Sequence, residues 1–212
     1  MNQNKIAEKL YQNSVNVRQD NLERLLVAYK GDYYFNLVDR LAGNKDAVIV
    51  DGMGGTGFFT VLLAKRGYKN LLVFDLSENN IKAARALFKR HKIKARALVS
   101  DIEKIRLKDN FTDLVVVMTS LHHLPSRTKA LRECKRILKP GGYLLAIEPN
   151  KLNPLALWRH WRSKPSVNEK LFSSGEIRSE IAPIFPEYRV FTHKFGYKII
   201  IIGRKPVRRK IR

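Results

Sequence analysis

The chain contains 212 residues, of which 44% are hydrophobic, and this length and composition predict a single globular domain with a substantial core. No apolar run approaches the roughly 20 residues of a membrane-spanning helix, and the N-terminus contains no apolar stretch of signal-peptide length. The single cysteine, Cys134, excludes an internal disulfide and is compatible with a reducing compartment. We therefore expect a cytoplasmic protein.

The formal net charge is +22, from 41 Lys and Arg against 19 Asp and Glu. This charge predicts attraction to a polyanion, namely RNA, DNA or an anionic membrane surface that the protein would bind peripherally. Residues 79–100 contain seven basic residues and no acid, and the tail at residues 204–212 contains six basic residues in nine. The alternative is a proteome rich in lysine and arginine, because charge informs about partners and not about fold.

Residues 1–45 are predicted to be helical, because their apolar residues recur at helical spacing. Two faces are expected, one of Leu22, Leu25, Leu26 and Tyr29, and one of Tyr34, Leu37, Val38 and Leu41. Gly31 separates the two helices, and Asp32 is placed to cap the second.

Beyond residue 46, short apolar strands alternate with helices. Five strands are expected, at residues 48–50, 71–74, 95–99, 114–118 and 143–147. Ser77 is placed to cap the helix after the second strand. The helix after Ser126 places Cys134 in its buried stripe, so this cysteine is expected to pack, and Pro140-Gly141-Gly142 would end the helix.

Continuous apolar strands predict a sheet that helices cover on both faces, and the strand–helix alternation predicts parallel order. The end of the chain differs from this pattern. A capping box from Ser173 to Glu176 begins another helix, and two strands follow, at residues 188–192 and 197–202. The few residues around Gly196 are too short for a parallel crossover, so these strands are predicted to form an antiparallel hairpin.

A glycine-rich turn joins the first strand to its helix in the segment VIVDGMGGTGFF, residues 48–59. Gly52, Gly54 and Gly57 fit the G-x-G-x-x-G pattern of dinucleotide binding, which would make the protein an NAD(P)-dependent oxidoreductase. Asp51 before the turn fits D-x-G-x-G-x-G, the version that holds an adenosyl sulfonium. In that register Met53 stands where the first glycine is expected. The pattern by itself leaves both nucleotides open.

Five segments in chain order resemble the motifs of the class I S-adenosylmethionine-dependent methyltransferases. They are VIVDGMGGTG, VFDLS, LVSDIEKI, FTDLVVVMTSLHHLP and LRECKRILKPGGYLLAIEPN. The resemblance covers roughly residues 45 to 203 and implies a Rossmann-like α/β fold. The implied fold is a seven-stranded mixed sheet in the order 3-2-1-4-5-7-6, with the last strand antiparallel and helices on both faces. We expect residues 1–45 as N-terminal helices over the substrate side, 46–203 as the core and 204–212 as a basic tail.

The resemblance implies S-adenosylmethionine as the cofactor. Its implied contacts are Asp51, Gly52, Met53, Gly55, Gly57, Asp75, Leu76, Asp101, Ile102 and Met118. Asp51 would accept from the amino group of the methionine moiety, Asp75 from both ribose hydroxyls, and Asp101 from the adenine amino group. Each of two carboxylates also has a purely structural interpretation: Asp51 could cap nearby backbone amides, and Asp75 could be the N-cap of the next helix.

Three apolar residues would contact the adenine ring under the same resemblance. Leu76 and Ile102 would sandwich it, unless both are ordinary core residues, and Met118 would offer its backbone. Met53 departs from the family pattern. Its side chain could crowd the ligand and reduce the affinity for the cofactor, or it could point into the core, where methionine fits irregular gaps. We favour the second interpretation.

His122 and His123 follow the fourth strand, where substrate and cofactor meet in this family. Methyl transfer from a sulfonium mainly requires alignment and exclusion of water. A base matters only if the nucleophile must lose a proton, and one histidine of the pair is the candidate catalytic base. The alternative is that both pack or orient neighbours. No metal site is expected, because the sequence near the pair shows no matching cluster of ligands.

The segment NPLALWRHWRSKP, residues 153–165, interleaves Trp158 and Trp161 with cations. Such a segment suits stacking on bases beside phosphates or insertion into an anionic membrane interface. The third interpretation is a lid helix with both tryptophans in the core. These three alternatives remain open.

We therefore expect an S-adenosylmethionine-dependent methyltransferase that methylates an O or N nucleophile. Its acceptor would be RNA, a lipid-linked or other anionic metabolite, or a neutral small molecule. The alternatives are a non-catalytic module of the same fold that binds RNA or an anionic membrane, and the oxidoreductase.

Overall fold

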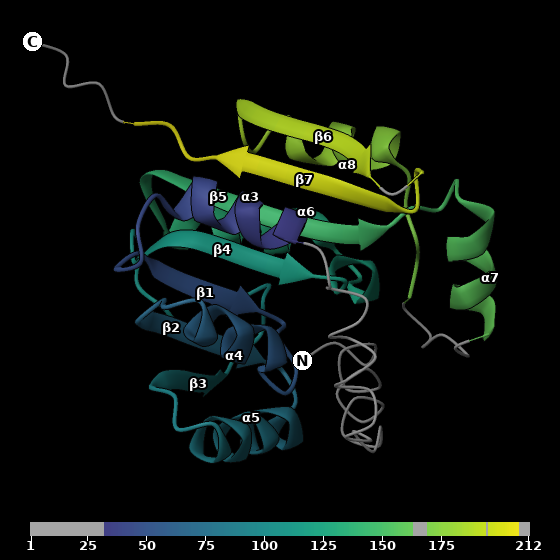
Figure 1. Ribbon diagram of the computed structural model, residues 1–212. Coiled ribbons are helices and arrows are strands. Elements are labelled where there is room, and N and C mark those ends of the chain that lie inside the picture. Colours follow the sequence, from purple (N-terminus) through teal and green to yellow (C-terminus); the bar gives the residue numbers. More distant parts are fainter. Residues whose placement is uncertain (1–31, 163–168, 194, 208–212) are drawn as a thin grey trace, which may run out of the picture.

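The computed structural model describes residues 32–162, 169–193 and 195–207. Its centre is a seven-stranded sheet in the order β3-β2-β1-β4-β5-β7-β6, which confirms the predicted order (Figure 1). The strands are β1 (Val48–Gly52), β2 (Asn70–Asp75), β3 (Ala95–Val99), β4 (Thr112–Met118), β5 (Leu138–Pro149), β6 (Glu187–His193) and β7 (Lys198–Arg204). β1 to β5 pair in parallel, and β7 runs antiparallel to both of its neighbours.

Helices cover both faces of the sheet, as the continuous apolar strands require. The helices are α3 (Asp32–Ala42), α4 (Phe58–Lys65), α5 (Glu78–Arg90), α6 (Arg127–Ile137), α7 (Pro154–Arg162) and α8 (Ser174–Ile181), with the short 3-10 helix η1 (Leu121–His123). α3, α4 and α5 pack on one face, and α6 and α8 on the other. None of the helices in the described ranges is long and apolar enough to cross a membrane.

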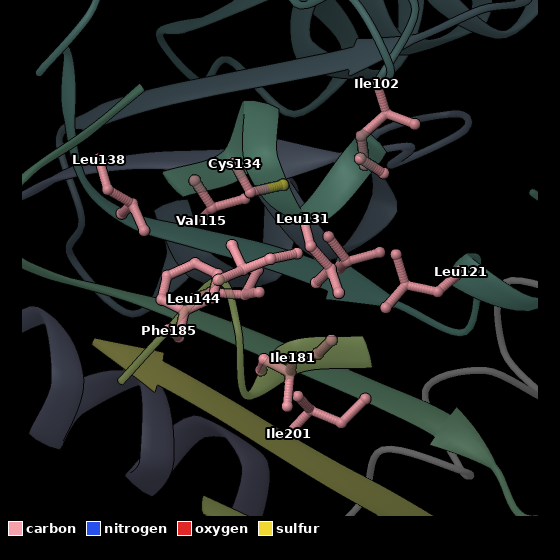
Figure 2. Packing of buried hydrophobic residues seen from close by; sticks show 14 of the residues in the cluster. Ile102, Val115, Leu121, Leu131, Cys134, Leu138, Leu144, Ile181, Phe185 and Ile201 are labelled. Atoms are coloured by element: carbon pink, nitrogen blue, oxygen red, sulfur yellow. The ribbon is translucent and has the colours of Figure 1, made fainter. Parts of the chain in front are cut away.

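The larger core cluster lies between the sheet and the pair α6 and α8. Leu131 and Cys134 of α6 meet Leu144 of β5 and Phe185, which follows α8 (Figure 2). Cys134 is fully buried, which confirms its packing role. Burial also raises the pKa of its thiol to about 12, so this cysteine is not a reactive thiol.

The other face corrects the expected position of α3, the part of the predicted N-terminal helices that the structure describes. Tyr34 and Val38 of α3 are buried against β5 and β7 residues such as Leu145 and Ile200, so α3 covers a face of the sheet and not the substrate side. Phe35, absent from the predicted apolar face, is buried there too and stacks on Phe59. The predicted helix with Leu22, Leu25, Leu26 and Tyr29 lies outside the described residues, as do 208–212 of the tail.

The predicted helix ends are largely confirmed. The Ser77 hydroxyl accepts from the backbone N–H of Asn80, and Ser173 and Glu176 form the capping box of α8. β5 is longer than predicted and includes Pro140-Gly141-Gly142. The backbone of Gly141 and Gly142 exchanges hydrogen bonds with Lys205, which extends the strand beyond the end of α6.

Candidate functional site

The carboxyl ends of β1, β2, β4 and β5 lie at one edge of the sheet, and α7 stands beside the same edge (Figure 1). Open α/β sheets bind ligands at this edge, next to the point where the strand order reverses. Here the order reverses between β1 and β4. The residues that the sequence singled out fall into two groups along this edge: one after β1 and β2, and one after β4 and β5.

Asp51 is the next-to-last residue of β1, and its carboxylate lies beneath the glycine turn. Its Oδ2 accepts from the hydroxyl of Thr60 at 2.7 Å, whereas its Oδ1 has no hydrogen-bond partner among the described residues, although it is buried. Burial raises the pKa of Asp51 to about 7, outweighing the opposing hydrogen bond from Thr60. A buried carboxylate with one unpaired oxygen fits a ligand that brings a cation.

The turn allows the backbone to come close to this carboxylate. A Cβ on Gly54 would lie 2.5 Å from Val73 and 2.6 Å from the Asp51 carboxyl carbon, so only glycine fits. Gly57 begins α4 with a φ of 72°, and a Cβ there would lie 2.8 Å from the ring of Phe88. Glycine is needed at both positions for close approach of the backbone.

Asp75 at the end of β2 is already engaged by the protein. Its Oδ2 accepts from the N–H of Gly55, and its Oδ1 accepts from the N–H of Ser77 and the amide of Asn80, all within 3.1 Å. Oδ1 thus already accepts two hydrogen bonds from the protein, and the expectation that Asp75 holds both ribose hydroxyls stays a prediction. Oδ2 retains room for one hydroxyl. Burial raises the pKa of Asp75, although these hydrogen bonds oppose the shift.

Met53 has a left-handed φ of 56°, the conformation that explains why the family pattern has glycine at this place. Its partly buried side chain packs against the larger core cluster, so it does not fill the turn. This packing agrees with the favoured interpretation, and the effect of Met53 on cofactor affinity stays a prediction. Thr119 at the end of β4 is also left-handed, with a φ of 55°, and strained backbone of this kind often accompanies binding sites.

The expected adenine contacts are only partly accessible. Asp101 is half-buried, and its Oδ1 accepts from the N–H of Glu103. Leu76 and Met118 are half-buried at the ends of their strands, but Ile102 is buried within the larger core cluster. Ile102 is therefore a core residue here. Gly52 is also buried, with the ring of Phe74 next to it.

The second group centres on His122 in η1. Its Nδ1 lies 2.6 Å from Oε2 of Glu148, a carboxylate that ends β5 and is fully buried. Oε1 of Glu148 also accepts from the N–H groups of Ser120 and Leu121, which fixes the start of η1. Burial would lower the pKa of His122, but Glu148 and Glu169 outweigh it and raise the pKa to about 9.

Glu169 brings two further histidines to this group. His123 Nδ1 and His122 Nε2 each lie 3.5 Å from one of its carboxylate oxygens, and His160 Nδ1 of α7 lies 3.1 Å from Oε1. The neighbouring Lys170 N–H donates to the carbonyl of His122 at 2.8 Å, which ties this segment to η1.

Sequence reasoning identified His122 and His123 but missed Glu148, Glu169 and His160. The pKa of His122 keeps its imidazole protonated near neutral pH, which disfavours a free base at this position. The sequence did not anticipate that His122, His123 and Glu169 offer ligand atoms within 4.8 Å of one another, and the expectation that no metal binds is untested. The only sequence signal for Glu148 was its place in EPN, residues 148–150, at the end of the last family-like segment. Nothing local pointed to Glu169.

The tryptophan segment forms α7 with its apolar residues in solvent. Trp158 is 50% exposed, Trp161 78% and Leu155 56%, whereas Ala156 is buried. The interpretation of a lid with both tryptophans in the core is therefore wrong. Phe195 in the β6–β7 turn is fully exposed, and its carbonyl accepts from the side chain of Asn153 beside the start of α7.

Comparison with known proteins gives a consistent picture. The family described as "Methyltransferase domain" matches residues 51–146. A curated relative, "Ubiquinone/menaquinone biosynthesis C-methyltransferase UbiE" of Paraburkholderia phymatum, is 33% identical over 106 residues, which are 49% of this chain and 44% of the relative. The chain thus spans less than half the length of that relative.

Solved structures share the fold at low sequence identity. The YcgJ protein of Bacillus subtilis has a TM-score of 0.69 at 14% identity, covering 83% of this chain and 99% of that protein. A SAM-dependent methyltransferase from Aquifex aeolicus has a TM-score of 0.66 at 21% identity, covering 89% of this chain and 99% of that protein.

Proposed function

We propose that the chain is a class I S-adenosylmethionine-dependent methyltransferase that transfers a methyl group from this cofactor to a small, lipid-soluble acceptor. The observation that carries the transfer proposal is Asp51, a buried carboxylate with an unpaired oxygen beneath a turn that only glycine can form. A dehydrogenase would have no need of a carboxylate at this place.

The bound cofactor would supply a methyl group already activated on its sulfonium. Asp51 would bind the ammonium of the methionine moiety, because its free Oδ1 needs a donor. Asp75 would accept one ribose hydroxyl through Oδ2 while it holds the turn through Gly55. The half-buried Asp101 and Leu76 remain the candidates for the adenine end.

The acceptor class rests on two supports. The curated relatives are named as C-methyltransferases of ubiquinone and menaquinone biosynthesis, and α7 presents apolar side chains to solvent beside the site. We infer that the acceptor is an aromatic precursor of a membrane quinone, methylated at carbon. This inference replaces the expected O or N nucleophile.

The exposed face of α7 fits a membrane better than RNA. Leu155 and Trp161 supply apolar area, and the exposed Arg159 and Arg162 supply charge for anionic lipid headgroups. The Arg162 guanidinium stands over the Trp158 ring at 4.8 Å and covers a face that a base would stack on. We propose that the protein reaches its acceptor at an anionic membrane surface.

Calorimetry tests the transfer proposal directly. The chain should bind S-adenosylhomocysteine and not NAD, and Asp51→Asn should weaken binding at least tenfold because the charge-assisted hydrogen bond is lost. Absence of S-adenosylhomocysteine binding in the folded wild type would contradict the proposal and favour the non-catalytic module.

Vesicle binding tests the membrane surface. Phosphatidylglycerol vesicles should bind the protein and shift its tryptophan fluorescence to the blue, and neutral vesicles should bind more weakly. Trp161→Ala should reduce binding about tenfold. Val207→Ala, which alters an exposed apolar residue after β7, is the control and should leave binding unchanged. Binding to single-stranded RNA but not to vesicles would replace the membrane with RNA.

A further inference from the structure

Three side chains that meet after β4 and β5 leave room for a cation. His122, His123 and Glu169 offer ligand atoms within 4.8 Å of one another, and the contacts from each imidazole to the Glu169 carboxylate are 3.5 Å long. A tetrahedral ion with bonds of ~2.0–2.1 Å places neighbouring ligand atoms about 3.3–3.4 Å apart. The two 3.5 Å contacts, from His122 to Oε1 and from His123 to Oε2 of Glu169, are longer than hydrogen bonds and close to this spacing. The cluster as a whole spans up to 4.8 Å and would have to contract around an ion.

The hydrogen bond to Glu148 gives His122 the tautomer that a metal requires. Because Nδ1 donates to the buried Glu148 at 2.6 Å, a neutral His122 presents the lone pair of Nε2 to Glu169. Two acceptors, Nε2 and a carboxylate oxygen, then face each other at 3.5 Å. Either a proton or a metal cation must stand between them. A carboxylate that orients a ligating histidine through its other nitrogen is a common feature of metal sites.

The third ligand is also held in place. His160 Nδ1 lies at hydrogen-bond distance from Oε1 of Glu169, 3.1 Å, and the segment is fixed by the Lys170 N–H on the His122 carbonyl. Further along, Phe172 is buried, and its carbonyl accepts from the N–H of Lys151. Glu169 is therefore positioned by α7, η1 and the end of β5 together.

We propose that His122, His123 and Glu169 bind a divalent transition-metal ion, with Zn²⁺ the best match to two imidazoles and one carboxylate. Three protein ligands leave one position open, which is the arrangement of a reactive and not a structural zinc site. Glu148 and His160 are positioning residues for this site.

The location suggests what the open position would hold. The Ser120 hydroxyl, just before η1, lies 3.4 Å from the Met53 carbonyl of the glycine turn, so the metal site adjoins the cofactor half. A metal ion there could take a hydroxyl oxygen of the acceptor and favour its ionised form. This role rests on the proposed function, whereas metal binding itself does not.

Metal binding can be measured on the full chain without a histidine tag. Chelator-treated protein, dialysed against Zn²⁺ and assayed by elemental analysis, should retain one zinc per chain. His123→Ala and Glu169→Gln should each lower the zinc affinity at least about 100-fold, more than the ~10–100-fold of a lost orienting partner. His160→Ala should lower it about tenfold. His91→Ala, which removes an imidazole at the end of α5, is the control and should change nothing.

Cobalt gives an independent readout. Co²⁺ in place of Zn²⁺ should show the intense visible absorption of a four-coordinate ion, and Glu169→Gln should abolish it. The proposal is overturned if the folded protein retains no zinc, or if the His123 and Glu169 variants bind as tightly as the wild type. The cluster would then be a set of ion pairs that holds a proton.

The same samples separate this result from the proposed function. S-adenosylhomocysteine binding with no zinc overturns only the metal site. Zinc binding without S-adenosylhomocysteine binding overturns only the proposed methyl transfer. Because Glu169 lies outside helices and strands, its variant should keep the cofactor half intact.

Discussion

The two halves of the site are built in different ways. After β1 and β2, hydrogen bonds join residues that are close in the chain: Thr60 donates to Asp51, nine positions away, and Gly55 donates to Asp75, 20 positions away. After β4 and β5, His122 reaches Glu148 across 26 positions, and Glu169 comes from a segment beyond α7. The first half depends on backbone conformation within a turn, and the second on side chains that the fold collects.

This difference predicts different sensitivities. The cofactor half should be sensitive to backbone and steric changes at glycine, because its geometry comes from close approach. The histidine half should be sensitive to charge and to metal, because its members meet through ionisable groups.

The largest effect is expected at Gly57. Gly57→Ala should lower the free energy of unfolding by about 2–4 kcal/mol, since it adds the left-handed penalty of ~1–2 kcal/mol to a clash with Phe88. Gly43→Ala is the matched control, with a φ of 77° and open space around the added methyl. Chemical denaturation of both variants measures the difference. Equal losses would show that packing against Phe88 plays no part.

Asp75→Ala should weaken S-adenosylhomocysteine binding by roughly 1.5–3 kcal/mol in calorimetry. Because the change also removes the acceptor for Gly55, Ser77 and Asn80, the free energy of unfolding should fall as well. Asp101→Ala should cost less stability, because Asp101 is half-buried and caps a local turn. Unchanged binding by the Asp75 variant would remove this residue from the site.

Asp51 should link cofactor binding to pH. Its folded-state pKa of about 7 lies above the ordinary value of 3.8, so the folded chain holds the proton longer than the unfolded chain does. Stability from this residue is thus highest at low pH and falls as pH rises from about 4 to about 7. Binding of the ligand ammonium favours the carboxylate, so S-adenosylhomocysteine affinity should rise about tenfold from pH 6 to pH 8.

Calorimetry in buffers of different ionisation enthalpy would detect the proton released on binding at pH 6. Asp51→Asn should abolish the release. Proton release that persists in this variant would assign the linkage to another group.

The smallest effect is expected at Met53. Met53→Gly should change S-adenosylhomocysteine affinity by less than about threefold, because the side chain packs in the core and not in the turn. Relief of the left-handed strain, ~1–2 kcal/mol, should offset most of the lost packing. The midpoint of thermal unfolding should therefore change little. A tenfold gain in affinity would show that Met53 obstructs the turn.

The order of the sheet was implied by the resemblance to a known family. The sequence by itself determined the strand runs, the terminal hairpin, the helix caps at Ser77 and Ser173, and the glycine turn with Asp51 and Asp75. These features depend on local backbone requirements: apolar strand runs, capping hydroxyls and a turn too tight for a Cβ. Only the tertiary structure decided that Ile102 belongs to the core, that Trp161 faces solvent and that Asp75 holds the turn. The fold also brings Glu148, Glu169 and His160 to the region of His122. These side chains are distant in the chain and meet where the strand ends and the connecting segments come together, so no local sequence pattern predicts their contacts.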